Sequence, residues 1–259
     1  MTRALVTGAA KRIGRALALE LADLGWDVAV HYGGSREAAE EVAGLIRAKG
    51  RKAVTVQADL TQENQVQTLV DRAGQGLGGA LDCLVNNASV FEFDTLDTAS
   101  RASWDKHMEA NLRAPFVLTQ RFAAQCPDVE TDDGGEPRAR GVIINMLDQR
   151  VRKLTPEFMT YTLSRAALWD LTQTSAQALG PRIRVNAIGP GPTLRGGRQD
   201  EDQFARQRAA TILGRGSDPQ DMCDALRYLL TARAVTGQLI CVDGGQHLAW
   251  ETPDVTGLE

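Results

Sequence analysis

The sequence predicts an α/β fold: a single domain built on a doubly wound parallel sheet of about seven strands, with helices on both faces. Two observations lead to this fold class. Short apolar runs alternate with longer amphipathic stretches along the 259 residues, which is the pattern of repeated βαβ units. Several of the apolar runs are continuous rather than alternating, as is typical of strands that are buried on both faces.

The expected elements follow one another in chain order. The strands are Ala4–Thr7, Asp27–His31, Ala53–Gln57, Leu81–Asn86, Val142–Met146, Arg184–Ala187 and Leu239–Val242. Helical patterns lie between them, at about residues 12–24, 35–49, 62–75, 98–124, 156–179 and 218–232. Right-handed crossovers between parallel strands then produce a sheet of the Rossmann type.

Two segments interrupt this alternation. Residues 127–141 are acidic, then basic, and rich in Gly and Pro, so they predict an exposed loop before a strand. Residues 190–216 carry many Gly and Arg residues around one short helical stretch, at a place where loops often cover a ligand. No linker divides the chain, so residues 1–250 are expected to form one domain and residues 251–259 a frayed C-terminal tail.

The composition excludes several classes of function. The formal net charge is −4, which argues against nucleic-acid and anionic-membrane partners. The apolar runs are too short to span a bilayer, and the first residues enter a strand without a signal-peptide pattern. The 4 cysteines form no C-x-x-C pair and the 3 histidines are scattered. We therefore expect no metal site and a reducing, cytoplasmic location.

The turn after the first strand carries the first functional signal. Gly8 directly follows this strand, and Gly14 lies at the start of the first helix. Glycine lets the backbone turn sharply, and the amides at a helix N-terminus favour a phosphate. The turn thus fits a dinucleotide-binding loop, although any turn that needs a positive φ would give the same two glycines.

The ends of the next two strands narrow the choice of dinucleotide. The second strand ends at His31, and the turn that follows runs to Ser35 without an acidic residue that could bind ribose hydroxyls. The missing acid, with Arg12 nearby, favours the 2′-phosphate of NADPH. After the third strand come Asp59 and Leu60; Asp59 either reaches the adenine amino group or caps the following helix.

Further short motifs stand in a fixed order over nearly the whole chain. They are Asn86-Asn87-Ala88-Ser89, Asn111, Asp148, Tyr161 with Arg165, Pro190-Gly191 and Val242-Asp243-Gly244-Gly245. In this order they resemble the short-chain dehydrogenase/reductase superfamily, whose usual signatures are T-G-x-x-x-G-x-G, N-N-A-G, a serine, Y-x-x-x-K and P-G. The resemblance implies cofactor contacts from Ile13, Asn87, Ala88, Ser89, Tyr161, Arg165, Pro190, Gly191 and Thr193.

The sequence departs from these signatures at four points. Arg12 replaces the middle glycine of the loop, Ser89 replaces the last glycine of N-N-A-G, Asp148 replaces the serine, and Arg165 replaces the lysine. The first three departures, together with His31-Tyr32 and the polar insertion before the fifth strand, resemble the pteridine reductase branch. Arg165 matches neither pattern.

Resemblance to that branch assigns roles to residues of the substrate site. It implies that Arg12 contacts both cofactor phosphate and pterin, and that Phe91, two positions after N-A-S, stacks on the pterin. Asp148 and Tyr161 are implied to handle protons, with Ser89 beside the substrate. Asn111, in a helix kink, is implied to hold water for the proton relay.

Residue chemistry supports part of these assignments. Tyr161 and Arg165 are four residues apart on a predicted helix, so they share one face. In the resembling enzymes the cation here binds the nicotinamide ribose and lowers the pKa of the tyrosine, since an opposite charge favours phenolate. Arginine supplies the charge but stays protonated. We therefore expect Arg165 to orient the cofactor and to weaken the resupply of protons.

Each remaining residue also has a structural interpretation. A carboxylate at Asp148 suits a substrate with N–H donors, although taken alone it is a solvated loop aspartate. Phe91 is either a stacking platform or ordinary packing, and Asn111 is either part of a relay or a satisfied helix asparagine. Arg195 and Arg198 either face an acidic substrate tail or are solvated loop cations, which is the more common case.

Together these residues predict hydride transfer from NADPH to a C=N bond of a pterin, dihydropteridine or dihydrofolate, with Tyr161 as proton donor and Asp148 as its partner. One alternative is a short-chain carbonyl reductase or alcohol dehydrogenase, which would need the hydroxyl donor that Asp148 removes. The other is a catalytically weak NADPH-binding protein, because Arg165 replaces the lysine. The resemblance also implies a homotetramer or homodimer, with which the apolar face around Leu163 and Leu171 is compatible.

Overall fold

A computed structural model describes residues 2–197 and 199–251 of the chain. Its strands are β1 (Arg3–Val6), β2 (Asp27–Tyr32), β3 (Ala53–Gln57), β4 (Cys83–Asn86), β5 (Glu130–Thr131), β6 (Pro137–Arg138), β7 (Gly141–Met146), β8 (Ile183–Pro190) and β9 (Leu239–Val242). Its α-helices are α1 (Arg12–Asp23), α2 (Arg36–Ala48), α3 (Glu63–Leu77), α4 (Arg101–Met108), α5 (Ala114–Gln125), α6 (Met159–Leu179), α7 (Glu201–Ala209) and α8 (Pro219–Thr231).

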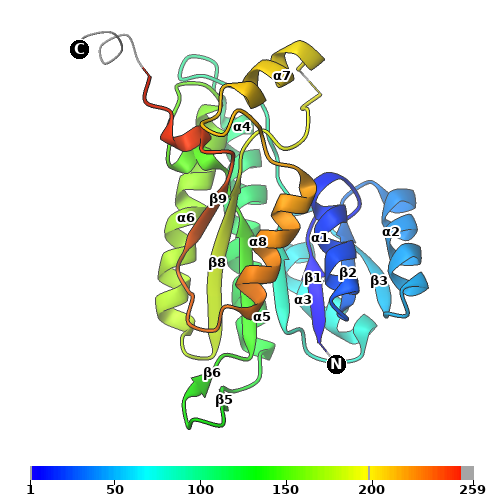
Figure 1. The fold of residues 1–259 in the computed structure, drawn as a ribbon. Helices are drawn as coiled ribbons and strands as arrows, with labels where there is room; N and C mark the ends of the chain where they lie inside the picture. The colour runs from blue at the N-terminus through cyan, green and yellow to red at the C-terminus, as the bar shows by residue number, and fades with distance from the viewer. Residues whose placement is uncertain (1, 198, 252–259) are drawn as a thin grey trace.

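Seven strands form one sheet in the order β3-β2-β1-β4-β7-β8-β9. Every neighbouring pair in it is parallel. The strand order reverses direction at β1, since the chain first builds outward to β3 and then continues from β4 on the other side (Figure 1). This confirms the predicted doubly wound parallel sheet of about seven strands, and it places a switch point between β1 and β4.

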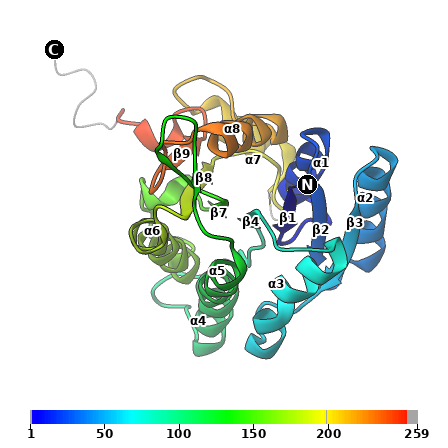
Figure 2. The same cartoon turned by 90° about the horizontal axis from the view of Figure 1, so that it is seen from below.

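Helices cover both faces of the sheet, as Figure 2 shows in a view from below. On one face α1, α2 and α8 bury residues such as Leu17, Val42 and Leu226 against β1, β2 and β4. On the other face α3 and α5 bury Leu69, Leu118 and Phe122 against the same sheet. The strand residues between the two layers read as continuous apolar runs because each side chain meets a helix whichever way it points.

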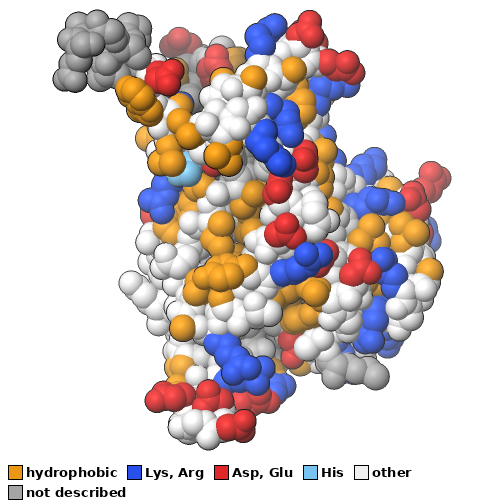
Figure 3. All heavy atoms as spheres, viewed as in Figure 1, with side chains coloured by type: hydrophobic (Ala, Val, Ile, Leu, Met, Phe, Trp, Pro, Cys, Tyr) orange, Lys and Arg blue, Asp and Glu red, His pale blue; other side chains and the backbone are white. Residues whose placement is uncertain are grey.

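The two ends of the sheet, where its strands finish and where they begin, differ in character. All strands of the sheet run toward the end that carries α7 and the C-terminal turn (Figure 1), and the predicted site residues follow those strand ends. At the opposite end, β5 and β6 form a small antiparallel hairpin, where Figure 3 shows acidic and basic side chains gathered. Arg140 pairs with Glu130 in this hairpin. No helix among the described residues is long and apolar enough to cross a membrane.

Three expected elements differ in detail. The segment 127–141, expected as a loop, contains the β5–β6 hairpin, and the helix expected from residue 156 begins at Met159. The single helix expected over residues 98–124 is divided into α4, a π-helical turn at Glu109–Arg113, and α5. The interruption lies where the buried Asn111 side chain binds the backbone of Val90 on the loop after β4.

The segment 190–216 contains the short helix that the sequence suggested, now α7. Its Asp200 caps that helix by accepting from the amide of Gln203 at 2.6 Å. The expected C-terminal tail falls on residues 252–259, which lie outside the described part of the chain, as does Arg198.

Candidate active site

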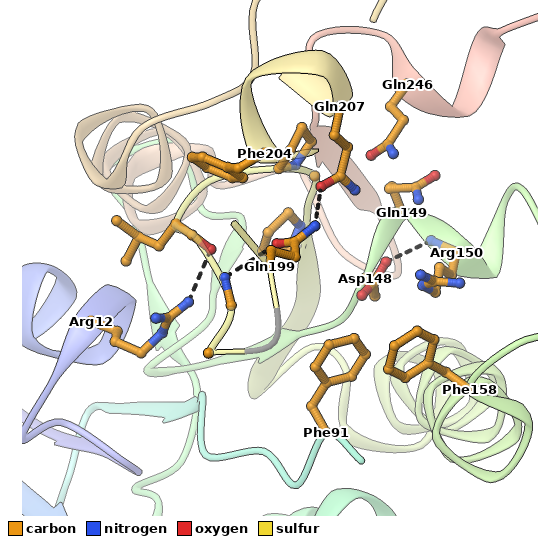
Figure 4. A pocket seen from close by; sticks show the side chains of 16 residues that line it. Arg12, Phe91, Asp148, Gln149, Arg150, Phe158, Gln199, Phe204, Gln207 and Gln246 are labelled. Atoms are coloured by element: carbon orange, nitrogen blue, oxygen red, sulfur yellow. Dashed lines mark hydrogen bonds between the residues drawn. The ribbon is translucent and has the colours of Figure 1, made fainter. Parts of the chain in front are cut away.

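Three adjoining hollows run along the carboxyl edge of the sheet. The first, of about 420 Å³, has among its lining residues Gly8, His31, Asp59, Leu60, Ala88 and Ser89. The second, of about 230 Å³, is lined by residues that include Arg12, Ile13, Asn87, Ser89, Asp148, Tyr161, Arg165, Pro190, Gly191 and Thr193. The third, of about 400 Å³ and shown in Figure 4, is lined by residues that include Arg12, Phe91, Asp148, Gln149, Phe158 and Gln246. Most predicted site residues therefore line one groove.

The turn between β1 and α1 is built to approach an anion closely. Gly8 has a φ of +62°, and a Cβ on Gly14 would lie 2.3 Å from the carbonyl oxygen of Gly8, so only glycine allows this packing. Lys11, the N-cap of α1, makes no side-chain cap, and the first turn of the helix holds no acidic residue. The N-terminal amides of α1 are thus available to a phosphate, which fits the dinucleotide predicted here.

Polar bonds hold this turn against the loop after β4. The hydroxyl of Thr7 accepts from the amides of Asn87 and Ala88 at 2.9 and 3.0 Å, while the Asn87 amide group donates to the carbonyl of Thr7 at 2.8 Å. Thr7 is 1% exposed, so these bonds are protected from water. The N-A-S loop and the glycine turn therefore form one wall of the groove.

His31 supports the same turn from below. Its Nδ1 accepts from the amide of Gly8 at 2.9 Å, and its Nε2 donates to the carbonyl of Ala58 at 3.1 Å. Burial lowers the pKa of His31 to about 4, so the ring is neutral and can accept a hydrogen bond from Gly8. His31 thus lines the first hollow and also positions the cofactor turn.

Asp59 and Ser35, which the sequence analysis expects at the adenosine end, follow the carboxyl ends of β3 and β2. Asp59 is exposed, and its carboxylate accepts from the amide and hydroxyl of Thr61 at 2.9 and 2.8 Å, so it closes a turn ahead of α3. Ser35 is the N-cap residue of α2 without a side-chain cap bond. Beside it stands the exposed cation Arg36, which the sequence analysis did not single out.

Arg12 does not lie where a contact with the 2′-phosphate of NADPH would require it. Its backbone is left-handed, with φ at 54°, and its guanidinium donates to the carbonyls of Leu194 and Arg195 at 3.1 and 3.0 Å. It lines the second and third hollows, not the adenosine end. The side chain therefore spans from the cofactor turn to the 190–216 segment, close to the expected substrate.

The central pair of the site is Tyr161 with Asp148. The Tyr161 hydroxyl donates to the Asp148 carboxylate at 2.9 Å, and the other carboxylate oxygen accepts from the amide of Arg150 at 2.9 Å. Burial raises the pKa of Asp148. Burial and the Asp148 charge raise the pKa of Tyr161 as well. The carboxylate is thus a hydrogen-bonded partner of the tyrosine.

Arg165 lies one turn below Tyr161 on α6 and is 2% exposed. One guanidinium nitrogen donates to the carbonyl of Met146 at 3.1 Å, and the guanidinium carbon is 5.2 Å from the centre of the Tyr161 ring. The cation favours phenolate, but burial and Asp148 outweigh it, so the net direction of the tyrosine pKa is opposite to the one expected. The buried Nε of Arg165 has no partner, which fits a ribose hydroxyl.

Two other predicted residues, Asn111 and Thr193, hold loops that border the groove, and Thr193 also lines the second hollow. Asn111 is fully buried; its side chain accepts from the Val90 amide at 2.8 Å and donates to the Val90 carbonyl at 2.9 Å and to the Ser164 hydroxyl at 3.1 Å. These bonds favour the interpretation as a satisfied asparagine that fixes the loop after β4. Thr193 is buried and shares a 2.6 Å hydrogen bond with Ser217, which anchors the start of the 190–216 segment.

The third hollow is lined by Phe91, which the sequence predicted, and by Phe158, which it did not. Phe91 is 44% exposed, and Phe158 stacks on it with ring centres 4.4 Å apart. Figure 4 shows both rings on one side of the cavity, with the amide side chains of Gln149 and Gln246 across from them. The sequence offered one signal for Phe158, its position three residues before Tyr161, and none for the two glutamines.

Comparison with known proteins identifies the family. The sequence model of a family described as enoyl-(acyl carrier protein) reductase matches residues 8–247. The 3-oxoacyl-[acyl-carrier-protein] reductase FabG of Staphylococcus epidermidis is 32% identical over 253 residues, which cover 95% of this chain and 98% of that protein. The chain belongs to the short-chain dehydrogenase/reductase superfamily.

Solved structures extend this likeness. The FolM alternative dihydrofolate reductase 1 from Brucella suis, in complex with NADP, is 43% identical, covers 98% of both chains and has a TM-score of 0.91. The angucycline C-6 ketoreductase LanV with bound NADP is 34% identical over 96% of both chains, with a TM-score of 0.86. These findings confirm the superfamily and the fold. Both complexes contain NADP, in agreement with the predicted cofactor.

Replacement of His31 by Gln should make the free energy of unfolding fall less steeply as the pH is lowered. A pKa lowered from 6.5 to about 4 means that the folded state holds His31 neutral while the unfolded chain takes up a proton. The wild type should therefore lose roughly 3 kcal/mol through this group as the pH falls from 6.5 to 4. Gln offers the same acceptor and donor without titrating. Urea unfolding at several pH values measures the slope, and equal slopes in both proteins would contradict the prediction.

Replacement of Asp148 by Asn should stabilise the protein at neutral pH. A raised pKa means that burying the charged carboxylate destabilises the fold once the pH exceeds the pKa of this group in the unfolded chain. Each kcal/mol corresponds to a rise in Tm of roughly 2–4 °C. Calorimetry should show the gain at pH 7 and its disappearance near pH 4.

Asp170→Asn on the exposed face of α6 is the matched control for that gain. It removes the same charge without relieving burial, so its Tm should stay close to that of the wild type. A Tm for Asp148→Asn that equals the wild-type value at pH 7 would show that the carboxylate is not destabilised by its surroundings.

Proposed function

We propose that this chain is an NADPH-dependent reductase that transfers hydride to a C=N bond of a pterin, dihydropteridine or dihydrofolate. The observation that carries the proposal is the hydrogen-bonded pair of Tyr161 and Asp148, 2.9 Å apart, at the junction of the second and third hollows. The aspartate stands where a carbonyl reductase of this superfamily would place a hydroxyl donor. The likeness to FolM alternative dihydrofolate reductase 1 from two Brucella species, at 43% and 42% identity, supports the same assignment.

The acceptor chemistry of Asp148 favours a substrate that presents N–H groups. A carboxylate accepts hydrogen bonds and cannot stabilise the oxygen of a ketone by donation. The amino-pyrimidinone edge of a pterin offers such donors, and a flat heterocycle fits beside the half-exposed Phe91. Arg12, whose guanidinium lies on the boundary between the two hollows, offers further donors to cofactor phosphate or to the pterin.

The second hollow fits the nicotinamide end of the cofactor. When bound there, NADPH supplies the hydride that adds to the carbon of the C=N bond. Arg165 orients the ribose through its unpartnered buried Nε. Gly191 lets the backbone after β8 pass close to Asp243, because a Cβ at position 191 would lie 2.5 Å from the Cβ of Asp243. Arg36, at the start of α2, provides the cation that the adenosine 2′-phosphate requires.

Proton delivery completes the reduction. One hydride and one proton add across each C=N bond, so the nitrogen needs a donor. Tyr161, whose raised pKa keeps its hydroxyl protonated at neutral pH, donates that proton. Asp148, whose pKa burial raises, passes a proton back to the tyrosine. Asp148 therefore supplies part of the proton resupply that the lysine of Y-x-x-x-K supports in the superfamily, and which Arg165 cannot perform.

A substrate panel tests the proposal directly. NADPH oxidation is followed by the loss of absorbance of the reduced nicotinamide, with dihydropterins and dihydrofolate in one set. Small ketones, a 3-oxoacyl thioester and a polycyclic aromatic ketone form the other set. We expect turnover with the first set. Turnover confined to the second would replace the proposal with a ketoreductase, in line with LanV and FabG, while NADPH binding without any turnover would indicate a catalytically weak binding protein.

Replacement of Arg165 by Lys should raise kcat several-fold and alter its pH dependence. Lysine keeps a cation beside the ribose and adds a group that can exchange protons, which arginine cannot do. The measurement is kcat against pH for both proteins with the best substrate of the panel. Unchanged kcat and an unchanged pH profile would mean that the Tyr161–Asp148 pair already meets the demand for protons.

A further inference from the structure

The stacked rings in the cavity come from two different elements. Phe91 lies on the loop after β4, and Phe158 immediately precedes α6. Their ring centres are 4.4 Å apart and their planes differ by 7°, and Figure 4 shows them side by side beneath the cavity. The guanidinium carbon of Arg150 lies 4.9 Å from the centre of the Phe158 ring. The geometry of this pair thus depends on how the loop after β4 meets the start of α6.

Phe158 stands in an unusual backbone conformation. Its φ of 57° and ψ of 49° are left-handed, and it is the N-cap residue of α6. A phenylalanine cannot cap a helix, and an L-residue in this region is strained, so its neighbours must hold it there. The cap comes instead from Asp94, which accepts from the amides of Met159 and Thr160 through its carbonyl and carboxylate at 3.3 and 3.1 Å.

A buried polar network joins the two ring-bearing segments. Asp94, His107 and Thr160 are 4%, 0% and 1% exposed. The Thr160 hydroxyl donates to the Asp94 carboxylate. The Nδ1 of His107 shares its proton between that hydroxyl at 2.8 Å and the carbonyl of Ser103 at 2.9 Å. The Nε2 of His107 accepts from the amide of Glu92 at 3.1 Å. The network therefore connects Glu92, the residue after Phe91, to Thr160, which lies two positions after Phe158.

We propose that Asp94, Thr160 and His107 are positioning residues that set the spacing and tilt of Phe91 and Phe158, and so decide which flat substrate the cavity accepts. This inference rests on the proposed function, because it assumes that the rings contact a planar substrate. None of the three side chains lines the hollows described above. Their effect reaches the substrate through residues that do line them: the two rings, and Tyr161, whose ring centre lies 6.1 Å from that of His107.

The charges around His107 define a pH dependence. Glu92 and Asp94 on the loop after β4 favour its protonation, Arg165 on α6 opposes it, and burial lowers the pKa overall. Lys106 on α4 is paired with Glu92. A protonated ring would turn Nε2 into a donor facing the Glu92 amide, so the loop would have to move. Because burial lowers the pKa of His107, we expect KM for the flat substrate to rise only at a pH below the ordinary histidine pKa of about 6.5, before kcat at saturation changes.

The first test uses a matched pair at Thr160. Thr160→Val keeps the shape of the side chain and its backbone amide but removes the hydroxyl that joins Asp94 to His107, whereas Thr160→Ser keeps the hydroxyl. We expect Val to weaken binding of an oxidised pterin to the NADP⁺ complex roughly fivefold, as loss of aromatic contact implies, and Ser to restore it. Affinity for NADP⁺ should not change. KM for the pterin substrate should rise, while kcat should stay within about twofold of the wild-type value.

The second test compares Phe158→Gly with Phe158→Ala and does not depend on the Thr160 variants folding. Both variants remove the ring and should lose pterin affinity to the same degree. Glycine adopts a φ near 57° without strain and alanine does not. The Gly variant should therefore unfold a few degrees above the Ala variant. Equal Tm values would show that the network does not enforce the left-handed backbone, which would overturn the proposal.

Calorimetric titration separates this proposal from the proposed function. Equal pterin affinity in the wild type and Thr160→Val overturns the positioning role while leaving the proposed function intact. If the wild type binds a polycyclic aromatic ketone and no pterin, the proposed function fails, and the same Val and Ser comparison on the ketone decides the positioning role. Failure of the wild type to bind either class of flat ligand overturns both.

Discussion

The hydrogen bond between the Tyr161 hydroxyl and the Asp148 carboxylate joins the two elements on which the site depends, the end of β7 and the first turns of α6. It brings a proton donor and an acceptor together where both are removed from water, so the pKa of each is raised. Arg165, one turn along the same helix, supplies the nearby positive charge, held by the carbonyl of Met146 on β7. Strand, helix and cation thus form one electrostatic unit.

The switch point of the sheet supplies the other half of the site. Thr7 at the end of β1 binds the amides that follow β4, and His31 at the end of β2 holds the amide of Gly8. These groups are buried and hydrogen-bonded, so the protein's own contacts hold the glycine turn in place. Arg12 then spans from this turn to the carbonyls of residues 194 and 195, so that the cofactor and substrate sides of the groove share a wall.

Much of this arrangement could be predicted from the sequence, because it depends on local pattern. Continuous apolar runs predicted seven parallel strands, and motif order placed Gly8, Asn87, Tyr161 and Gly191 along one edge. The sequence did not predict where Arg12 would point, because a long side chain can reach either end of the groove. Nor did it predict that the Tyr161 pKa would be raised, since that depends on the balance between burial, Asp148 and Arg165.

By itself, the sequence determined the doubly wound sheet through its hydrophobic period, and through the order of its motifs the resemblance to the superfamily that the comparisons confirm. Only the tertiary structure decided what surrounds the reacting groups. Phe158 became part of the cavity because Asp94, which lies 66 residues before Thr160 in the chain, caps α6 in its place. Such contacts join segments that are distant along the chain, and burial makes them effective, so no local pattern records them.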